Sequence, residues 1–184
     1  MPNTKKVVIT AMLVALCVVL PMAFHMIPYG LAGRALLPMH IPVLLAGLIC
    51  GPIFGLVVGV TGPILSYLSS GGTMPPSAAI MYSMMIELGV YGLVAGLVMK
   101  FVRTKMASAD LYIALVVAML AGRVVAGIVQ ALFLFEGNYA ITIWFSAYFS
   151  FALPGIVIQL AFIPSVVMAL EREKVIPLRY PIKA

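Results

Sequence analysis

The chain has 184 residues, of which 64% are hydrophobic and 9% are charged, and its mean hydropathy is +1.20. Soluble domains are about 45–50% apolar and about 25% charged, so a soluble protein of this size lacks the polar surface to cover so many apolar side chains. The formal net charge of +6 does not favour nucleic-acid binding, because the basic residues lie at the chain ends and in one central segment. The composition therefore predicts a membrane protein.

Apolar runs in the first part of the chain predict three spans, since a spanning helix needs about 20 mostly apolar residues. The first run covers residues 7–27. It is longer than the apolar part of a signal peptide and no small-residue cleavage site follows it, so we expect it to be retained. Residues 28–35 break the pattern. Two short runs, 36–50 and 53–69, follow around a Gly-Pro turn, and a merged, re-entrant or kinked pair is an alternative there.

Three longer apolar runs, 78–99, 111–135 and 143–170, complete the pattern. The basic segment KFVRTKMASAD separates the first two, and FEGNYAIT separates the last two. The runs together predict an all-α fold, namely a polytopic membrane protein with six transmembrane helices in a single membrane domain over residues 1–184.

The distribution of charge predicts the orientation of these helices. Lysines and arginines concentrate in three segments, 5–6, 100–105 and 172–183, which fall on one side of a six-span chain. The segments on the other side carry only Arg34 and Glu136 as charged residues. Cytoplasmic segments carry an excess of Lys and Arg, so we expect both termini in the cytoplasm of a multi-pass protein of the bacterial cell membrane.

Two ionisable residues, Glu87 and Arg123, lie inside predicted spans, where such groups are costly and usually face a cavity or one another. Tyr91 shares a helix face with Glu87, and Gln130 shares one with Arg123, because residues four or seven positions apart lie on one side of a helix. One interpretation is an intramembrane Glu87–Arg123 ion pair that fixes the helix register. The other is that one or both residues bind a polar ligand in a pocket open to the outside.

The stretch GRALLPMHIPVLLAG, residues 33–47, places polar and helix-breaking residues against an apolar run. Pro38 suits a first helical turn, whereas Pro42 predicts a distorted start or a kink. Arg34 lies at the expected outer boundary, where its side chain reaches water or a ligand. We expect His40 either to be hydrated at this boundary or to form a wall of a ligand pocket.

The outer segment before the last span adds Asn138 and the single tryptophan of the chain, Trp144. A tryptophan near the end of a span is commonly an interfacial residue, and a role in ligand binding is the alternative.

No enzyme or metal site is predicted. The chain contains two histidines and lacks a Ser/His/Asp arrangement, an HExxH motif, a P-loop and a GxGxxG motif. Cys17 and Cys50 lie in apolar runs without a CxxC motif, which favours buried apolar side chains. We therefore expect neither catalysis nor a cofactor.

Small residues at four-residue spacing predict close helix packing. Ala11 and Ala15 lie on one face of the first helix, and Gly92 and Gly96 lie on one face of the fourth. Such spacing lets helix backbones approach closely in lipid, where apolar burial no longer drives association. Packing within the chain and docking of an external helix are both compatible with the pattern.

Several motifs occur together along the chain. AMLVA lies in the first predicted helix, LLPMHIPVLLAGLICGPIFGLVVG follows it, and MPP precedes an ELGVYGLVAGL helix. With the basic N-terminus and the short six-span layout, these motifs resemble the substrate-binding S components of energy-coupling factor (ECF) transporters. The resemblance covers nearly the whole chain.

The resemblance implies a protein that captures a vitamin or related micronutrient from the outer side and has no nucleotide site of its own. It also implies partners, namely a membrane coupling subunit that docks on Ala11 and Ala15 and two cytosolic ATPase subunits. Two other functions stay open from the residues. A self-sufficient small secondary transporter or channel would show ion- or proton-driven flux, and a membrane enzyme would form a product from a lipid or quinone.

The resemblance leaves the ligand open between two classes. Arg123 suits a carboxylate such as pantothenate through charge-assisted hydrogen bonds. A small aromatic alcohol of the pyridoxine or hydroxymethylpyrimidine type would instead use His40, Glu87, Asn138 and Trp144. The candidate substrate-binding residues are Arg34, His40, Glu87, Tyr91, Arg123, Gln130, Asn138 and Trp144.

Overall fold

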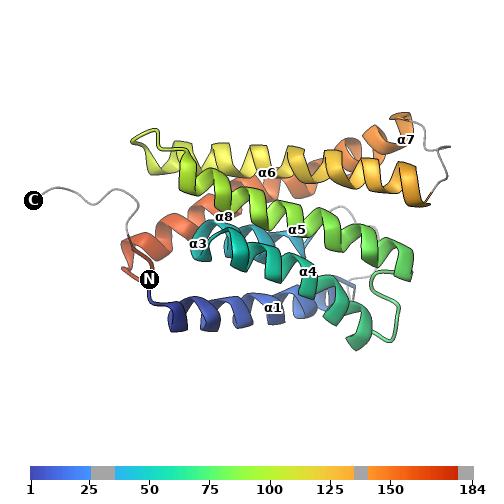
Figure 1. Cartoon of the computed structure of the whole chain (residues 1–184), viewed down its shortest axis with the longest axis horizontal. Helices are drawn as coiled ribbons and strands as arrows, with labels where there is room; N and C mark the ends of the chain where they lie inside the picture. Colours follow the sequence, from blue (N-terminus) through green and yellow to red (C-terminus); the bar gives the residue numbers. More distant parts are fainter. Residues whose placement is uncertain (26–35, 135–140, 178–184) are drawn as a thin grey trace, which may run out of the picture.

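A computed structural model describes residues 1–25, 36–134 and 141–177, and it is helical without strands over these ranges. The helices are α1 (Asn3–His25), α3 (His40–Cys50), α4 (Pro52–Ser69), α5 (Ala78–Phe101), α6 (Ala107–Val129), α7 (Ile141–Phe145) and α8 (Leu153–Arg172), with π-helical segments η1 (Gln130–Leu134) and η2 (Ser146–Ser150). The long helices run along the long axis of the molecule, and the short α3 lies among them (Figure 1).

Five of the described helical stretches are long and apolar enough to cross a membrane: Asn3–Phe24, Pro52–Ser69, Ala78–Phe101, Ala107–Leu132 and Tyr148–Arg172. These stretches agree with five of the six predicted runs. The run 36–50 differs, because its helix α3 has only 11 residues. At about 1.5 Å per residue α3 spans about 16 Å, which is roughly half of a hydrocarbon core of about 30 Å.

The start of α3 explains how the chain accommodates two prolines. Leu37 adopts a left-handed conformation with φ of +49°, and the His40 N–H donates to the Leu37 carbonyl at 3.0 Å. The helix begins only at His40, so Pro38 precedes it and Pro42 falls in its first turn, where no N–H is required. The expected distorted start thus takes the form of this turn before His40, and Pro42 itself lies in the first turn of α3.

Close backbone contact among α3, α4 and α5 forms the centre of the bundle. The glycine interface, as we call it, consists of Gly47, Gly55, Gly59, Gly92 and Gly96. A Cβ atom on Gly92 would overlap the backbone of Gly55, and one on Gly47 would overlap the Gly92 carbonyl. The small-residue spacing in these helices therefore serves packing within the chain.

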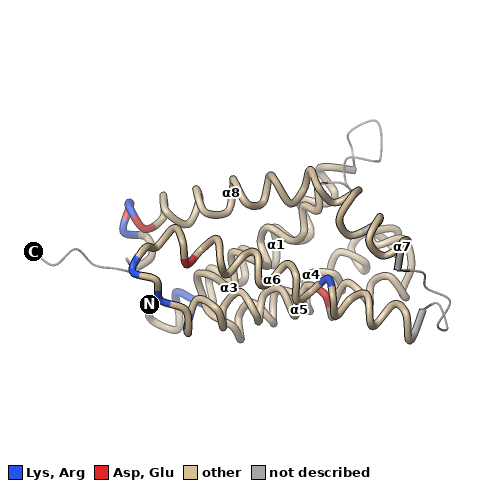
Figure 2. The backbone as a smooth tube through the Cα atoms, turned by 90° about the horizontal axis from the view of Figure 1, so that it is seen from above, with Lys and Arg blue, Asp and Glu red and all other residues tan. Residues whose placement is uncertain are grey.

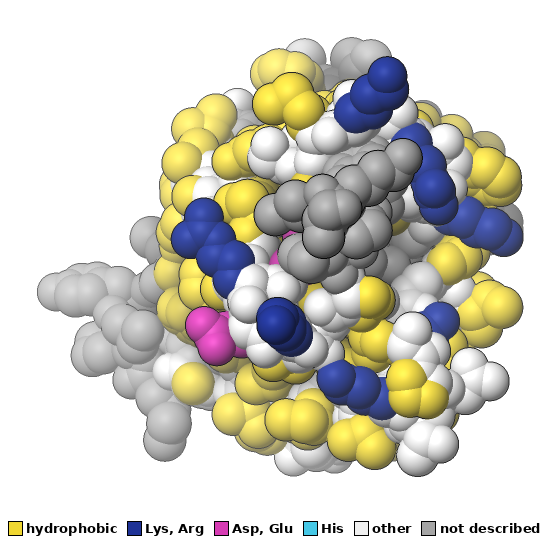
Figure 3. Space-filling model, turned by 90° about the vertical axis from the view of Figure 1, so that its left-hand side faces the viewer, with side chains coloured by type: hydrophobic (Ala, Val, Ile, Leu, Met, Phe, Trp, Pro, Cys, Tyr) yellow, Lys and Arg dark blue, Asp and Glu magenta, His cyan; other side chains and the backbone are white. Residues whose placement is uncertain are grey.

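Basic residues gather at one end of the bundle, where α1 and α6 begin and α5 and α8 end (Figures 1 and 2). This basic end carries the described residues Lys5, Lys6, Lys100, Arg103, Lys105, Arg172 and Lys174. Figure 3 looks onto it and shows Lys and Arg side chains distributed around the bundle. Cys50 Sγ donates to the Lys6 carbonyl at 3.8 Å, so α3 ends at the basic end and begins inside the bundle.

Candidate ligand-binding site

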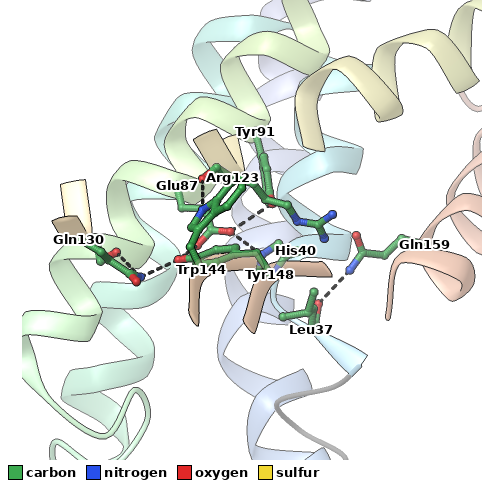
Figure 4. A network of polar contacts seen from close by, with 10 residues as sticks. Leu37, His40, Glu87, Tyr91, Arg123, Gln130, Trp144, Tyr148 and Gln159 are labelled. Carbon is green, nitrogen blue, oxygen red and sulfur yellow. Dashed lines mark hydrogen bonds and ion pairs between the residues drawn. The ribbon is translucent and has the colours of Figure 1, made fainter. Parts of the chain in front are cut away.

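A polar network lies inside the bundle (Figure 4). It brings together residues from α3, α5, η1, η2, α6, α7 and α8. Its members are His40, Ser83, Glu87, Tyr91, Arg123, Gln130, Trp144, Tyr148 and Gln159. The structure thus brings six of the candidate substrate-binding residues together, namely His40, Glu87, Tyr91, Arg123, Gln130 and Trp144.

Glu87 is surrounded by three polar groups from three elements. Its side chain is buried, and its Oε1 accepts a hydrogen bond from the Tyr91 hydroxyl at 3.1 Å. The Tyr148 hydroxyl lies 3.5 Å from Oε2, and His40 Nε2 lies 3.7 Å from Oε1. Tyr91 can reach Glu87 because the two residues are one turn apart on α5. The chain thus supplies its buried carboxyl group with its own partners.

Gln130 connects α5 with the two π-helical segments. Its amide nitrogen Nε2 donates to Ser83 Oγ at 3.1 Å and to the Tyr148 hydroxyl at 2.6 Å. Gln130 begins η1 and Tyr148 lies in η2, so this connection joins two irregular segments. Single π-helical turns are uncommon and frequently occur at functional sites.

Arg123 is only 3% exposed, and it forms no ion pair with Glu87 in the described part of the chain. Glu87 Oε1 instead lies 3.7 Å from His40 Nε2. Of the two interpretations of Glu87 and Arg123, the ion pair between them is therefore not formed. The guanidinium carbon of Arg123 lies 5.3 Å from the centre of the Phe149 ring. Its Nη2 atom is buried and has no hydrogen-bond partner among the described residues.

Two glycines of α6 make room for the aromatic rings of the network. The indole N–H of Trp144 donates to the Arg123 carbonyl at 3.1 Å, and a Cβ on Gly127 would overlap this indole. A Cβ on Gly122 would likewise overlap the Tyr91 ring. The absence of side chains at these two positions therefore sets how closely the rings approach α6.

Further buried polar atoms in the network lack hydrogen-bond partners. Gln159 is fully buried, and its Nε2 donates to the Leu37 carbonyl at 3.4 Å while its Oε1 has no partner in the described part of the chain. Both ring nitrogens of His40 are also buried without a hydrogen bond there. These atoms and Arg123 Nη2 offer both donors and acceptors inside the bundle.

Two predicted site residues, Arg34 and Asn138, lie outside the described residues. Conversely, Ser83, Tyr148 and Gln159 belong to the network, and the Phe149 ring contacts Arg123, but none of the four is among the predicted site residues. Ser83 lies one turn before Glu87 and Tyr148 lies one turn after Trp144, so helical spacing alone pointed to both. No group of three His, Cys, Asp or Glu side chains able to hold a metal ion occurs among the described residues.

The predicted docking residues Ala11 and Ala15 lie far from this network in the sequence and face outward. Both are exposed on α1, together with Met12 and Leu16 at 64% and 41% exposure. The opposite face of α1 is the one that packs on α3 and α4. Within residues 1–25, 36–134 and 141–177, the small-residue face of α1 therefore makes no packing contact comparable to the glycine interface.

Comparison with known proteins gives one finding. The family model described as "ECF transporter, substrate-specific component" matches residues 5–167. No match to the chain was found among curated proteins or among solved structures.

Proposed function

The chain belongs to the family of ECF transporter substrate-specific components and is a multi-pass, substrate-binding transporter subunit, and we propose that it captures a B vitamin or vitamin precursor from outside the cell. The candidate ligands are those of the pantothenate class and of the pyridoxine or hydroxymethylpyrimidine class. The chain delivers its ligand together with a membrane coupling subunit and two cytosolic ATPase subunits.

One observation carries this proposal: the polar network encloses buried polar atoms that have no partner in the described chain. A buried polar group without a hydrogen bond costs about 1–3 kcal/mol, and a charged one costs more. A helical bundle in lipid gains nothing from such groups unless a polar ligand satisfies them. The network therefore supports a site for a small polar molecule.

The position of the network supports entry from the outside. We propose that the run 36–50 is the second of six membrane segments. Both termini and the basic end then lie on the cytoplasmic side of the cell membrane. Glu87 lies nine residues after the start of α5, which is about 14 Å from the end opposite the basic end. The network is thus closer to the outer side.

The direct test uses the purified chain without its partners. We expect the chain in detergent micelles to bind one ligand of the two classes in a 1:1 complex without ATP, measured by isothermal titration calorimetry. We also expect no uptake when vesicles contain this chain alone. Autonomous ion- or proton-driven uptake would contradict the proposal and indicate a self-sufficient transporter.

The outward face of α1 supports a docking surface for the coupling subunit. We expect Ala11→Trp and Ala15→Trp to abolish transport by the assembled complex while ligand affinity stays within about twofold, because the bulky ring blocks close helix approach. Val116→Trp, on the exposed face of α6, is the matched control and should transport normally. Loss of ligand binding in both α1 variants would instead assign these alanines to folding.

A further inference from the structure

The two charged residues inside the bundle are treated differently by the rest of the chain. Glu87 has Tyr91, Tyr148 and His40 around its carboxyl group, whereas Arg123 Nη2 has no hydrogen-bond partner among the described residues. We propose that the ligand carries a carboxylate and that Arg123 binds it. This inference rests on the proposed function and narrows it to one ligand class.

A buried guanidinium whose Nη2 has no partner in the described chain is costly inside a membrane bundle. Arginine inside a membrane protein nearly always pairs with an anion or with backbone carbonyls. The Phe149 ring contributes a cation–π contact at 5.3 Å, but a ring cannot accept the in-plane N–H bonds of a guanidinium. A carboxylate can, and its two oxygens match the fork of donors on an arginine.

Glu87 is not available to supply that anion. Its three neighbours hold it on the α3 and η2 side, with Oε1 bonded to Tyr91 and Oε2 close to the Tyr148 hydroxyl. Tyr148 is itself fixed by Gln130 at 2.6 Å. Turning Glu87 toward Arg123 would break these contacts, so no carboxyl group of the described residues completes the site, and a ligand carboxylate would.

Other groups around Arg123 agree with an anionic ligand that also has a hydrogen-bond donor. The N-terminus of α3 begins inside the bundle at His40, and the positive end of a helix dipole favours negative charge nearby. Gln159 Oε1 is a buried acceptor without a partner in the described chain, so it suits a hydroxyl or amide N–H of the ligand.

A neutral aromatic alcohol fits this arrangement less well. It would supply hydroxyl groups for His40 and Gln159 but would leave the charge of Arg123 without an anion. Of the two ligand classes, the structure therefore favours small polar molecules with one carboxylate.

The experiment compares acids with matched neutral analogues on the intact chain in detergent micelles. The pairs are pantothenate with panthenol, nicotinate with nicotinamide, and pyridoxate with pyridoxine. In the pair that binds, we expect the acid to bind about 10- to 100-fold more tightly than its neutral partner, which is the size of a charge-assisted hydrogen bond. We expect Arg123→Gln to remove this preference, so that the acid and its neutral partner bind with similar affinities.

Two further measurements keep the result decisive. Arg123→Lys retains the charge without the fork and should keep an intermediate preference, even where Arg123→Gln folds poorly. Mass spectrometry of the molecule released from the purified wild-type chain should identify a carboxylic acid. If this acid is not one of the three tested above, the acid and its neutral amide are compared as a fourth pair.

The outcomes separate this inference from the proposed function. A neutral member that binds as tightly as its acid, or a released ligand without an acidic group, overturns the carboxylate inference but leaves a substrate-binding subunit. An acid preference that survives Arg123→Gln in a folded protein overturns the role of Arg123. If no compound binds and none is released, the proposed function fails together with the inference.

Discussion

The glycine interface and the polar network lie in the same bundle but are built in opposite ways. In the glycine interface, backbone meets backbone, and a single added methyl group at Gly55 or Gly92 would overlap the facing helix. In the polar network, side chains from many elements meet, and several of their polar atoms have no partner in the described chain. The first region is complete in itself, whereas the second leaves buried polar atoms that the proposed ligand would satisfy.

The difference separates stability from binding. Helices in lipid associate through close packing rather than through burial of apolar surface, so α3, α4 and α5 depend on their glycines. Arg123 and Gln159 contribute unsatisfied groups, which cost stability until a ligand satisfies them. Substitutions in the two regions should therefore change the stability of the unliganded chain in opposite directions.

The largest effect is expected from Gly55→Val. Its side chain would enter the backbone of Gly92, and overpacking of this kind is expected to lower the free energy of unfolding by about 3 kcal/mol or more. The measurement is unfolding of the chain in mixed micelles, followed by circular dichroism. Val57→Leu, on the exposed face of the same helix, should change stability by less than about 0.5 kcal/mol. Equal stability of both variants would remove the glycine interface as the basis of the fold.

A smaller effect of opposite sign is expected from Arg123→Met. Methionine resembles the apolar stem of arginine but lacks its buried charge, for which the described residues supply no hydrogen-bond partner at Nη2. The free energy of unfolding of the unliganded chain should therefore rise by about 1–2 kcal/mol in the same assay. Arg103→Met, at an exposed position, is the matched control and should be neutral. A loss of stability in Arg123→Met would mean that the guanidinium is held by the chain itself.

The smallest effect concerns the bond between Gln130 and Tyr148. A double-mutant cycle with Gln130→Leu and Tyr148→Phe should give a coupling energy of about 0.6 kcal/mol, the average for side-chain hydrogen bonds between membrane helices. A second cycle that replaces Tyr148→Phe by Tyr112→Phe, on the exposed face of α6, should give none. Equal coupling in the two cycles would contradict the network as drawn in Figure 4.

Neighbours on one helix could be predicted from the sequence because helical spacing determines them. Tyr91 was expected beside Glu87, and its hydroxyl donates to that carboxyl group. The five long spans follow from the lengths of the apolar runs. Partners across helices could not be predicted in this way, since spacing along one helix carries no information about the rotation of another.

The short helix α3 explains why one of the two interpretations of Glu87 and Arg123, the ion pair, is not realised. Hydropathy indicates a segment of 36–50 but not that its helix begins at His40, inside the bundle. That start brings the His40 ring within 3.7 Å of Glu87, so His40 takes the place that the sequence had suggested for Arg123. The π-helical turns at η1 and η2 were equally invisible to a 3.6-residue period, and they position Gln130 and Tyr148.

The indole of Trp144 has a spectroscopic consequence. It is the single tryptophan of the chain, and its N–H donates to the carbonyl of Arg123, the residue proposed to meet the ligand. All tryptophan emission from the protein therefore originates at the site. A ligand that arrives beside Arg123 should shift or quench this emission, so ligand binding can be followed on the unlabelled chain. Excitation at the red edge of the absorption band avoids emission from the eight tyrosines.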